Sequence, residues 1–255
     1  MVLSEQQLEE FQKYGYTVVP SFYSAEEVEL ISAWLNGLRD SDGTENDVAT
    51  YFETSPSSGE TVLVRAEHLL GDHSPAITEM LLKVDAMQAL GEVLGDAPLL
   101  FKEKANYKLP ECRSDLLHQD QAAGWGTYAN FFVTMLVAVD ENRIDNAAIS
   151  FRRAEGHKLE LLGPEWEVLS EDEPPFQPEQ DYKVIEANPG DVVLFDCYVP
   201  HGSPANLTDR ARRNVYLTFN RKSDGDHRMA YYHDKWENYP PNTRDEARDR
   251  SSFRV

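Results

Sequence analysis

The spacing of apolar residues changes near residue 97, and this change predicts two parts of different construction. In the first part apolar residues recur every three or four positions, which is the period of an amphipathic helix. The clearest such stretch contains Val28, Ile31, Leu35 and Leu38. Capping-box sequences at residues 4–7 and 24–27 mark two helix starts, and Gly15 is a typical helix stop. We therefore expect residues 1–97 to be mainly helical.

Three shorter features complete this first part. Residues 16–19, which precede Pro20, predict a short strand. Residues 40–60 are acidic, rich in serine and interrupted by glycine and proline, so we expect a loop there. A helical pattern returns at residues 75–94, where Gly95 can end the helix.

From residue 98 onward apolar residues alternate with polar ones, which is the period of a β-strand. Strand-like runs occur at residues 98–109, 128–139, 147–151, 182–186, 192–195 and 214–220. Turn sequences separate several of these runs without an intervening helix, which favours a mainly β fold, a sandwich or jelly roll with helices outside. We expect one domain over residues 1–255, with a β core at about 98–222 and a tail at 223–255 that contains a short helix.

Composition and charge narrow the class of protein. The chain has 255 residues, of which 41% are hydrophobic, enough for a sizeable core. Its 24 basic and 45 acidic residues give a formal net charge of −21. Such a surface repels phosphate backbones and anionic lipids, so neither nucleic acid nor a membrane surface is an expected partner. No apolar run is long enough to span a bilayer.

The N-terminal residues and the cysteines bear on location. The opening sequence MVLSEQQLEEFQ lacks the basic and apolar regions of a secretory signal. Cys112 and Cys197 are the two cysteines, too few for a disulfide framework, and neither lies in a nucleophile motif. We expect a cytoplasmic protein with reduced thiols. The sequence does not determine its oligomeric state.

Candidate chemistry begins with a histidine and an aspartate two positions apart. His118 and Asp120 lie in the stretch DLLHQDQAAGW. Residues two apart on a strand point to the same side, so this pair could supply a nitrogen and a carboxylate to one metal ion. A polar turn is the alternative, because among 7 histidines and 45 acidic residues about one such pair is expected by chance.

The second half of the chain contains the residues that such a site would still need. A non-haem iron(II) oxygenase uses two histidines and one carboxylate and leaves positions open for substrate and dioxygen. His201 is a candidate for the second histidine, with a surface-loop histidine as the alternative. Arg212 follows on the next strand-like run, and its guanidinium could clamp a carboxylate with two parallel hydrogen bonds. Ser203 could add a hydroxyl donor. The alternative for Arg210, Arg212 and Arg213 is a solvated charge run.

Taken together, His118-Gln119-Asp120, His201-Gly202-Ser203 and Arg212 resemble the signature of the phytanoyl-CoA dioxygenase family of iron(II)- and 2-oxoglutarate-dependent oxygenases. The similarity spans most of the chain, from LEEFQKYGYTVVPSFYSAEEV through FKEKANYKLP, HQDQAAGW and GDVVLFDCYVPHGS to RRNVYLTFN. The His-x-Asp pair alone is a weak signal, but the ordered set is a strong one. The resemblance implies a double-stranded β-helix, a cupin-like jelly roll with iron in its mouth.

The resemblance also implies roles for individual residues. His118, Asp120 and His201 would bind Fe(II), with no catalytic residue beyond these metal ligands. Arg212 and Ser203 would hold the distal carboxylate of the cosubstrate 2-oxoglutarate, and Asn106 matches a position that contacts the cosubstrate. In the family reaction, O2 and 2-oxoglutarate are consumed, succinate and CO2 are released, and a C–H bond of a small-molecule substrate is hydroxylated.

The substrate has to be inferred from one strand. Lys104, Asn106 and Lys108 share one face of it, and Phe101 and Tyr107 share the other. If the basic face lines the barrel, its lysines would meet an anionic group, because a buried charge needs a partner. A solvated outer face is the alternative, since alternation gives sidedness but not direction. We expect a small polar substrate that carries a carboxylate or phosphonate, rather than a neutral lipid or sterol.

Two further features concern the pocket and the substrate. Trp125 would lie near the pocket mouth, with a plain core aromatic as the alternative. Family members usually carry a strand that ends in Pro-Gly-Ser-His, whereas this chain has NAAISFRRAEGHK, with Arg152, Arg153 and Glu155 in unusual positions. This departure leaves the iron ligands intact, but it puts in doubt any substrate carried over from a better-known relative.

Two other classes of function stay open at this point. A jelly-roll small-molecule-binding protein without oxygenase activity, with or without a metal, would keep the fold without needing the metal residues together with Arg212. A halogenase uses the same architecture, but such relatives replace the carboxylate by a small residue, and Asp120 is present.

Overall fold

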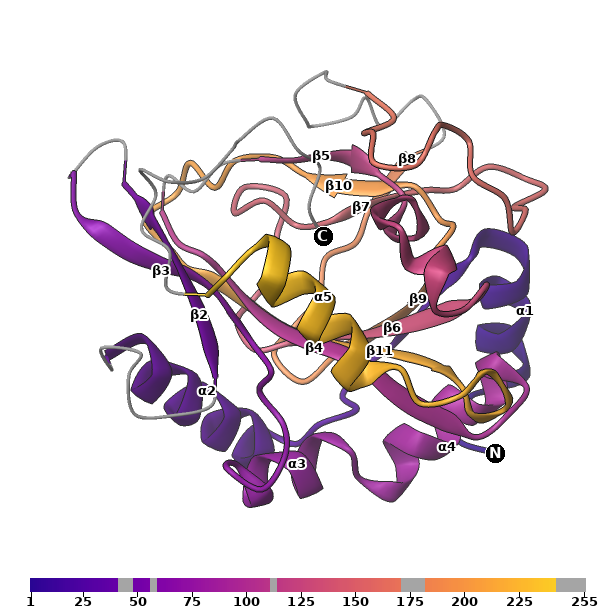
Figure 1. Ribbon diagram of the computed structural model, residues 1–255, viewed down its shortest axis with the longest axis horizontal. Coiled ribbons are helices and arrows are strands. Elements are labelled where there is room, and N and C mark those ends of the chain that lie inside the picture. The colour runs from indigo at the N-terminus through magenta and orange to yellow at the C-terminus, as the bar shows by residue number, and fades with distance from the viewer. Residues whose placement is uncertain (41–47, 56–58, 111–113, 171–181, 242–255) are drawn as a thin grey trace.

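The computed structural model describes residues 1–40, 48–55, 59–110, 114–170 and 182–241 (Figure 1). Within these residues two antiparallel β-sheets face each other. The larger sheet has the order β1 (Tyr16–Val19), β9 (Val192–Asp196), β6 (Phe132–Ala138), β11 (Arg212–Arg221), β4 (Pro98–Lys108), β3 (Thr61–Glu67), β2 (Ala49–Thr54). The smaller sheet has the order β5 (Asp115–His118), β10 (His201–Ser203), β7 (Ser150–Arg152), β8 (Tyr182–Val184). This arrangement confirms the predicted jelly roll with helices outside.

The helices of the first part follow the sequence signals, except that the single run predicted at residues 75–94 forms two helices separated at Leu82 and Lys83. They are α1 (Glu5–Tyr14), α2 (Ala25–Asp40), α3 (Pro75–Leu81) and α4 (Val84–Leu94). Ser4 and Gln7 form the capping box of α1, and Gly15 ends this helix with φ = 78°, a left-handed conformation that glycine adopts without strain. α2, α3 and α4 cover the lower side of the larger sheet in Figure 1, where Leu35 and Leu90 join the main core.

The prediction of a loop at residues 40–60 is wrong in part. Residues 49–54 form β2, which pairs antiparallel with β3, so the mainly helical first part also contributes three strands to the larger sheet. The sequence signal is weak there because β2 is short and carries Thr50 and Glu53 among its apolar residues. Its stability comes from pairing with β3, which the sequence alone does not reveal. Residues 41–47 and 56–58 lie outside the described residues.

Other strand boundaries shift by a few residues. The run predicted at 128–139 becomes a strand only at Phe132, because the chain before it forms the 3-10 helices η1 (Asp120–Ala123) and η2 (Trp125–Thr127). β10 was not predicted, since three residues are too few to show a period. The tail contains η3 (Lys222–Asp224) and α5 (Arg228–Asn238), the short helix that the sequence predicts.

The two faces of β4 point in opposite directions, and the structure decides which is inside. Tyr107 points outward to the helices, where its hydroxyl donates to the Leu35 carbonyl of α2 at 2.8 Å. On the other face, Lys102, Lys104 and Lys108 expose only 3%, 8% and 5% of their surface. The basic face therefore lines the interior of the jelly roll, and the alternative of a solvated face is excluded.

Phe101 departs from this alternation. Thr218 of β11 pairs with Lys102, but the next residue, Phe219, pairs with Leu100, so Phe101 is an extra residue in a β-bulge. The bulge turns its ring away from Tyr107, and Phe101 packs on Trp125 with ring centroids 5.5 Å apart. The prediction that Phe101 and Tyr107 share a face is therefore wrong.

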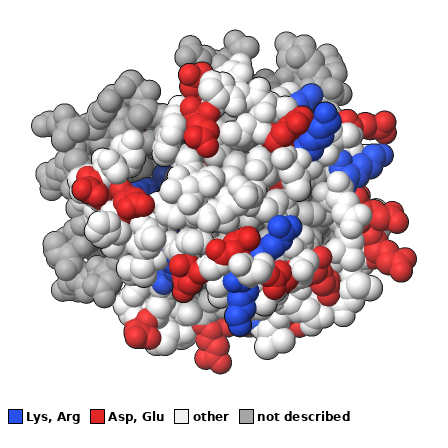
Figure 2. Space-filling model, turned by 45° about the vertical axis from the view of Figure 1, so that its right-hand side comes forward, with Lys and Arg blue, Asp and Glu red and all other residues white. Residues whose placement is uncertain are grey.

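The molecular surface is acidic, as the composition predicts. Figure 2 shows several separate groups of Asp and Glu side chains on the visible face, with Lys and Arg side chains mostly beside them rather than in a continuous basic patch. Among the described residues, no helix has the length and apolar character needed to cross a membrane.

Candidate active site

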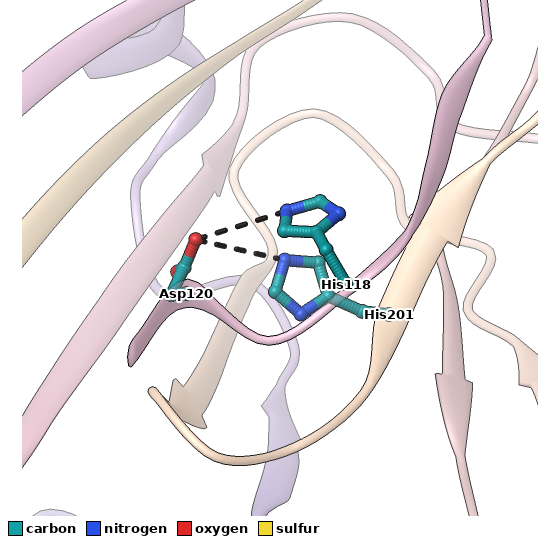
Figure 3. A group of neighbouring side chains, drawn as sticks. All are labelled: His118, Asp120 and His201. Carbon is teal, nitrogen blue, oxygen red and sulfur yellow. Dashed lines mark ion pairs between the residues drawn. The ribbon is translucent and has the colours of Figure 1, made fainter. Parts of the chain in front are cut away.

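Two histidines and one aspartate meet between the two sheets. His118 ends β5 and His201 begins β10, and their Cα atoms are partners in the smaller sheet. Asp120 is the first residue of η1. Its Oδ1 lies 3.8 Å from His118 Nε2 and 3.9 Å from His201 Nε2, and both rings point toward it (Figure 3). The structure therefore brings together the three residues predicted as metal ligands.

Backbone carbonyls orient the two imidazoles. His118 Nδ1 lies 2.7 Å from the Leu116 carbonyl, and His201 Nδ1 lies 3.0 Å from the Val199 carbonyl. A ring nitrogen beside a carbonyl must carry the proton, so each Nε2 presents its lone pair toward the space shared with Asp120. Such bonds from the other ring nitrogen are the usual support of metal-binding histidines.

The protonation states also suit a metal. Burial, followed by the proximity of His201, lowers the pKa of His118 to about 4, so its imidazole is neutral at pH 7. Burial alone would raise the pKa of Asp120, but His201, Lys102 and Lys104 outweigh it and the pKa is lowered. Metal ions bind neutral imidazole and ionised carboxylate, and these three ligand atoms lie within 4.8 Å of one another. Two imidazoles and one carboxylate on one side of a metal fit iron(II) with open positions opposite.

A second cluster lies beside Ser203, at the Lys108 end of β4. Lys108 Nζ donates to Asp115 Oδ2 at 2.8 Å and to Ser203 Oγ at 2.6 Å. Arg212 pairs directly with Lys108 across β11 and β4 and is only 3% exposed. Its Nη1 donates to Asn142 at 3.2 Å, while its Nε has no hydrogen-bond partner within the described residues. This end therefore holds two buried cations and a hydroxyl, with a guanidinium nitrogen left for a further acceptor.

The structure also separates the three neighbouring arginines. Arg210 is exposed and pairs with Asp145. Arg213 points outward to Asp140 at 2.7 Å and to α2. Of these three, Arg212 alone is buried inside the jelly roll: Arg213 is the next residue on β11 and faces the opposite side, and Arg210 precedes the strand.

Asn106 lies on the same inner face of β4, between Lys104 and Lys108. It pairs with Asn214 of β11 and with Arg65 of β3. Its Oδ1 is buried without a hydrogen-bond partner among the described residues. It is therefore available to a molecule held between the two ends of the strand.

A third cluster lies farther along the same inner face, around Lys102 and Lys104 in the middle of β4 and toward α5. Burial, then Arg65, lowers the pKa of Lys104 to about 8, while Asp120 opposes this shift. The Lys104 ammonium lies 5.3 Å from the centre of the Tyr216 ring, and the Lys102 ammonium lies 4.4 Å from that of Trp125. Four residues along a strand span about 13 Å, so Lys108 and Lys104 serve different ends of the site.

Residues of two further elements, α5 and β3, belong to this third cluster, and the sequence analysis did not identify them. Lys235 of α5 donates to Glu67 of β3 at 2.7 Å and to the hydroxyl of Tyr231 at 3.3 Å. Arg65 lies 3.5 Å from the same Glu67 oxygen. α5 crosses in front of β4 in Figure 1, so these groups meet only in the folded chain. For Lys102 the sequence did contain a signal, because alternation along the strand places it on the same face as Lys104.

Trp125, predicted either at the pocket mouth or in the core, is 1% exposed and packs among Phe101, Phe132 and Tyr231. Its ring lies against the Lys102 ammonium inside the protein and is not exposed at the pocket mouth.

Two remaining sequence features are structural. The Cys197 thiol is buried, which raises its pKa well above the usual value and rules out a nucleophile at neutral pH. Cys112 lies outside the described residues. In the unusual segment, Arg153 lies over the Tyr14 ring at 4.6 Å, and Glu155 pairs with Lys13 at 3.3 Å. This segment therefore packs against the end of α1.

Known proteins share this combination of fold and residues. The family described as phytanoyl-CoA dioxygenase (PhyH) matches residues 11–214. The chain is 32% identical to a 2-aminoethylphosphonate dioxygenase from the uncultured bacterium HF130_AEPn_1, over 98% of this chain and 94% of that protein. It is 30% identical to a methylphosphonate hydroxylase from Gimesia maris, over 91% of this chain and 86% of that protein.

Solved structures agree with the fold. EctD from S. alaskensis, crystallised with 2-oxoglutarate and 5-hydroxyectoine, matches with a TM-score of 0.68 at 21% identity, over 88% of this chain and 78% of that chain. The same protein with bound Fe gives a TM-score of 0.67. At this identity the likeness confirms the double-stranded β-helix.

Proposed function

The chain belongs to the phytanoyl-CoA dioxygenase family and is an iron(II)- and 2-oxoglutarate-dependent dioxygenase, and from this premise we propose that it hydroxylates a C–H bond of a small phosphonate. Two relatives at 30% identity or more carry phosphonates in their names. The buried Lys104 beside Asp120 provides an independent reason to expect an anionic substrate.

In this proposal the two ends of the inner face of β4 bind different molecules, and the metal ligands lie beside them. His118, Asp120 and His201 hold the iron. With O2 and 2-oxoglutarate, the iron supplies the oxidation that hydroxylates the substrate and releases succinate and CO2. Arg212 and Ser203 bind the distal carboxylate of 2-oxoglutarate, with Asn106 along its length. We place Lys108 with them, because it already donates to Ser203.

The single observation that carries the choice of substrate is the position of Lys104. Its side chain is 8% exposed, faces the interior and interacts electrostatically with Asp120. A buried ammonium is costly unless an anion meets it, and Asp120 is needed by the metal. A phosphonate on Lys104 would satisfy that charge and place the carbon chain of a small substrate near the iron ligands.

The test is 2-oxoglutarate turnover by the iron-loaded protein with methylphosphonate, 2-aminoethylphosphonate, a matched carboxylate and a neutral compound. We expect succinate formation coupled to a product heavier by one oxygen, detected by mass spectrometry, with the phosphonates only. A jelly-roll binding protein without oxygenase activity would give no succinate above background. Coupled hydroxylation of the neutral compound, with no reaction of either phosphonate, would contradict the proposal.

Lys104→Met tests the carrying observation, because methionine keeps the length of the side chain without its charge. We expect KM for the phosphonate to rise about 10- to 100-fold, the effect of losing a hydrogen bond to a charged group. Uncoupled 2-oxoglutarate consumption should stay nearly intact. Lys158→Met, on an exposed lysine that pairs with Glu160 at 3.4 Å, is the matched control.

A further inference from the structure

Lys102 is the most deeply buried cation of the inner face that no part of the proposed mechanism yet uses. Its side chain is 3% exposed, and its Nζ has no hydrogen-bond partner within the described residues. Two aromatic rings surround the ammonium, Trp125 at 4.4 Å and Tyr231 at 5.6 Å. Aromatic faces attract a cation but do not replace the hydrogen bonds that it loses on leaving water. An ammonium in this position requires a ligand with acceptor oxygens.

The neighbouring carboxylates do not supply them. Glu67 Oε1 faces Lys235 at 2.7 Å and Arg65 at 3.5 Å, and Glu67 Oε2 makes no hydrogen bond within the described residues, so Glu67 does not bond to Lys102. Asp120 faces the imidazoles of His118 and His201. Burial, followed by Lys104 and Lys235, lowers the pKa of Lys102 well below its usual value, while Asp120 and Glu67 oppose this shift. Among the described residues of this cluster, the four cations Lys102, Lys104, Lys235 and Arg65 share the two carboxylates of Glu67 and Asp120.

Lys102 and Lys104 are two residues apart on the same strand face, roughly 7 Å along the backbone. Both long side chains can therefore reach one tetrahedral group from two sides. A phosphonate offers three oxygens and up to two negative charges, as a phosphate monoester does. A carboxylate or a phosphinate offers two oxygens and one charge, which leaves one ammonium without a partner.

Resting on the proposed function, we propose that Lys102 and Lys104 form a two-lysine seat for the phosphonate, and that Lys102 is the residue that selects a dianionic phosphonate over monoanionic acids. Lys104 contacts the oxygen nearer the metal ligands, and Lys102 contacts an oxygen on the side of Trp125. Trp125 and Tyr231 keep water from Lys102, so its charge interacts with the phosphonate at low dielectric. Lys102 positions the substrate and takes no part in the oxidation.

The experiment measures binding, so that it does not depend on turnover. The full-length protein is loaded with Fe(II) and 2-oxoglutarate without oxygen, and titrated in a calorimeter with methylphosphonate and with methylphosphinate. These two compounds differ by one oxygen and one negative charge. We expect the wild-type protein to bind methylphosphonate at least about tenfold more tightly than methylphosphinate.

Lys102→Met should remove this preference. Methylphosphonate binding should weaken about 10- to 100-fold, methylphosphinate binding should change by less than about threefold, and their ratio should approach one. The Kd of 2-oxoglutarate should stay unchanged, because Arg212 and Lys108 lie at the other end of β4. The melting temperature without phosphonate should not fall, since the substitution removes a buried charge that lacks a partner. Lys158→Met should leave all these values unchanged.

Three results would overturn the proposal. One is equal binding of the two compounds by the wild-type protein, which needs no variant. Another is a Lys102→Met protein that melts earlier and keeps the wild-type ratio, which would make Lys102 a structural residue. The third is loss of selectivity in Lys104→Met but not in Lys102→Met. In that third case methylphosphonate would still be hydroxylated. The proposed function would then be retained, and the proposal that Lys102 and Lys104 together bind the phosphonate would be rejected.

Discussion

The two ends of the inner face of β4 have similar charges but differ in how those charges are partnered. At the end of Lys108, where we place 2-oxoglutarate and which we call the cosubstrate end, Lys108 donates to Asp115 and Ser203, and Arg212 donates to Asn142. At the end of Lys102 and Lys104, where we place the phosphonate and which we call the substrate end, Lys102 has no hydrogen-bond partner among the described residues. The cosubstrate end is thus largely preorganised by protein groups. The substrate end keeps a charge that only a ligand can satisfy.

This difference indicates how specificity is divided between the two ends. Preorganised partners reduce the ordering cost of binding, which suits a cosubstrate that is the same in every turnover. A buried charge without a partner lowers the stability of the empty protein but rejects ligands that leave it unpaired. Selectivity among acids should therefore depend mainly on the substrate end, and the following predictions test that division.

The largest effect is expected at the metal, which both ends need. Asp120→Ala removes the only carboxylate of the triad, so iron content should fall and hydroxylation should become undetectable. Elemental analysis of protein loaded without oxygen, together with product mass spectrometry, measures both. Asp209→Ala, on an exposed residue, is the control. Full hydroxylation by the Asp120 variant would exclude this aspartate as a ligand.

The next effect should separate the two ends. Arg212→Ala removes the guanidinium partner that we assign to the distal carboxylate of 2-oxoglutarate in a buried site, a loss of about 2–5 kcal/mol in binding free energy. The apparent 2-oxoglutarate requirement should rise accordingly, while the ratio of methylphosphonate to methylphosphinate affinity stays as in the wild type. Arg210→Ala, on the exposed neighbour that pairs with Asp145, should change neither value. Equal effects of the two substitutions would mean that Arg212 is not the clamp.

A smaller effect should appear in the pH dependence. Lys104 has a pKa of about 8, lowered by burial and by Arg65, so it loses its positive charge as pH rises through that value. Because kcat/KM reports the free enzyme, it should fall above pH 8 for methylphosphonate, by up to about tenfold per pH unit. Ionisation of the substrate acts in the opposite direction and is the same for every variant. Lys104→Met should therefore lack the falling limb, and an identical limb in both proteins would assign it to another group.

The smallest effect concerns a region outside both ends. Arg153→Ala removes a cation–π contact with Tyr14 at the end of α1, which should lower the free energy of unfolding by about 0.5–1 kcal/mol. Thermal melts measure this loss. KM for 2-oxoglutarate and for the phosphonate should both stay constant. A clear shift in the KM of the phosphonate would connect the unusual Arg152–Glu155 segment to the substrate after all.

Local patterns in the sequence determined most of the secondary structure of this protein and its candidate metal triad. Helical spacing and the signals at Ser4, Gly15 and Gly95 located the helices, and the change to alternation at residue 98 located the β core. The candidate metal triad was also predictable, because His118, Asp120 and His201 form an ordered set with Arg212. Such features depend on residues close in the chain or on an ordered motif, and they can be recognised before any contact is known.

Only the tertiary structure decided which way these elements face and what they meet. Alternation predicts that Lys104 and Tyr107 lie on opposite faces of β4. The packing of Tyr107 against α2 decides that the lysine face is the inner one. A β-bulge, fixed by pairing with β11, moved Phe101 to Trp125. Glu67 and Lys235 join the substrate end from β3 and α5, which are 168 residues apart in the chain. Strand register and helix packing set these contacts through the sum of many long-range interactions, and a local pattern contains no information about that sum.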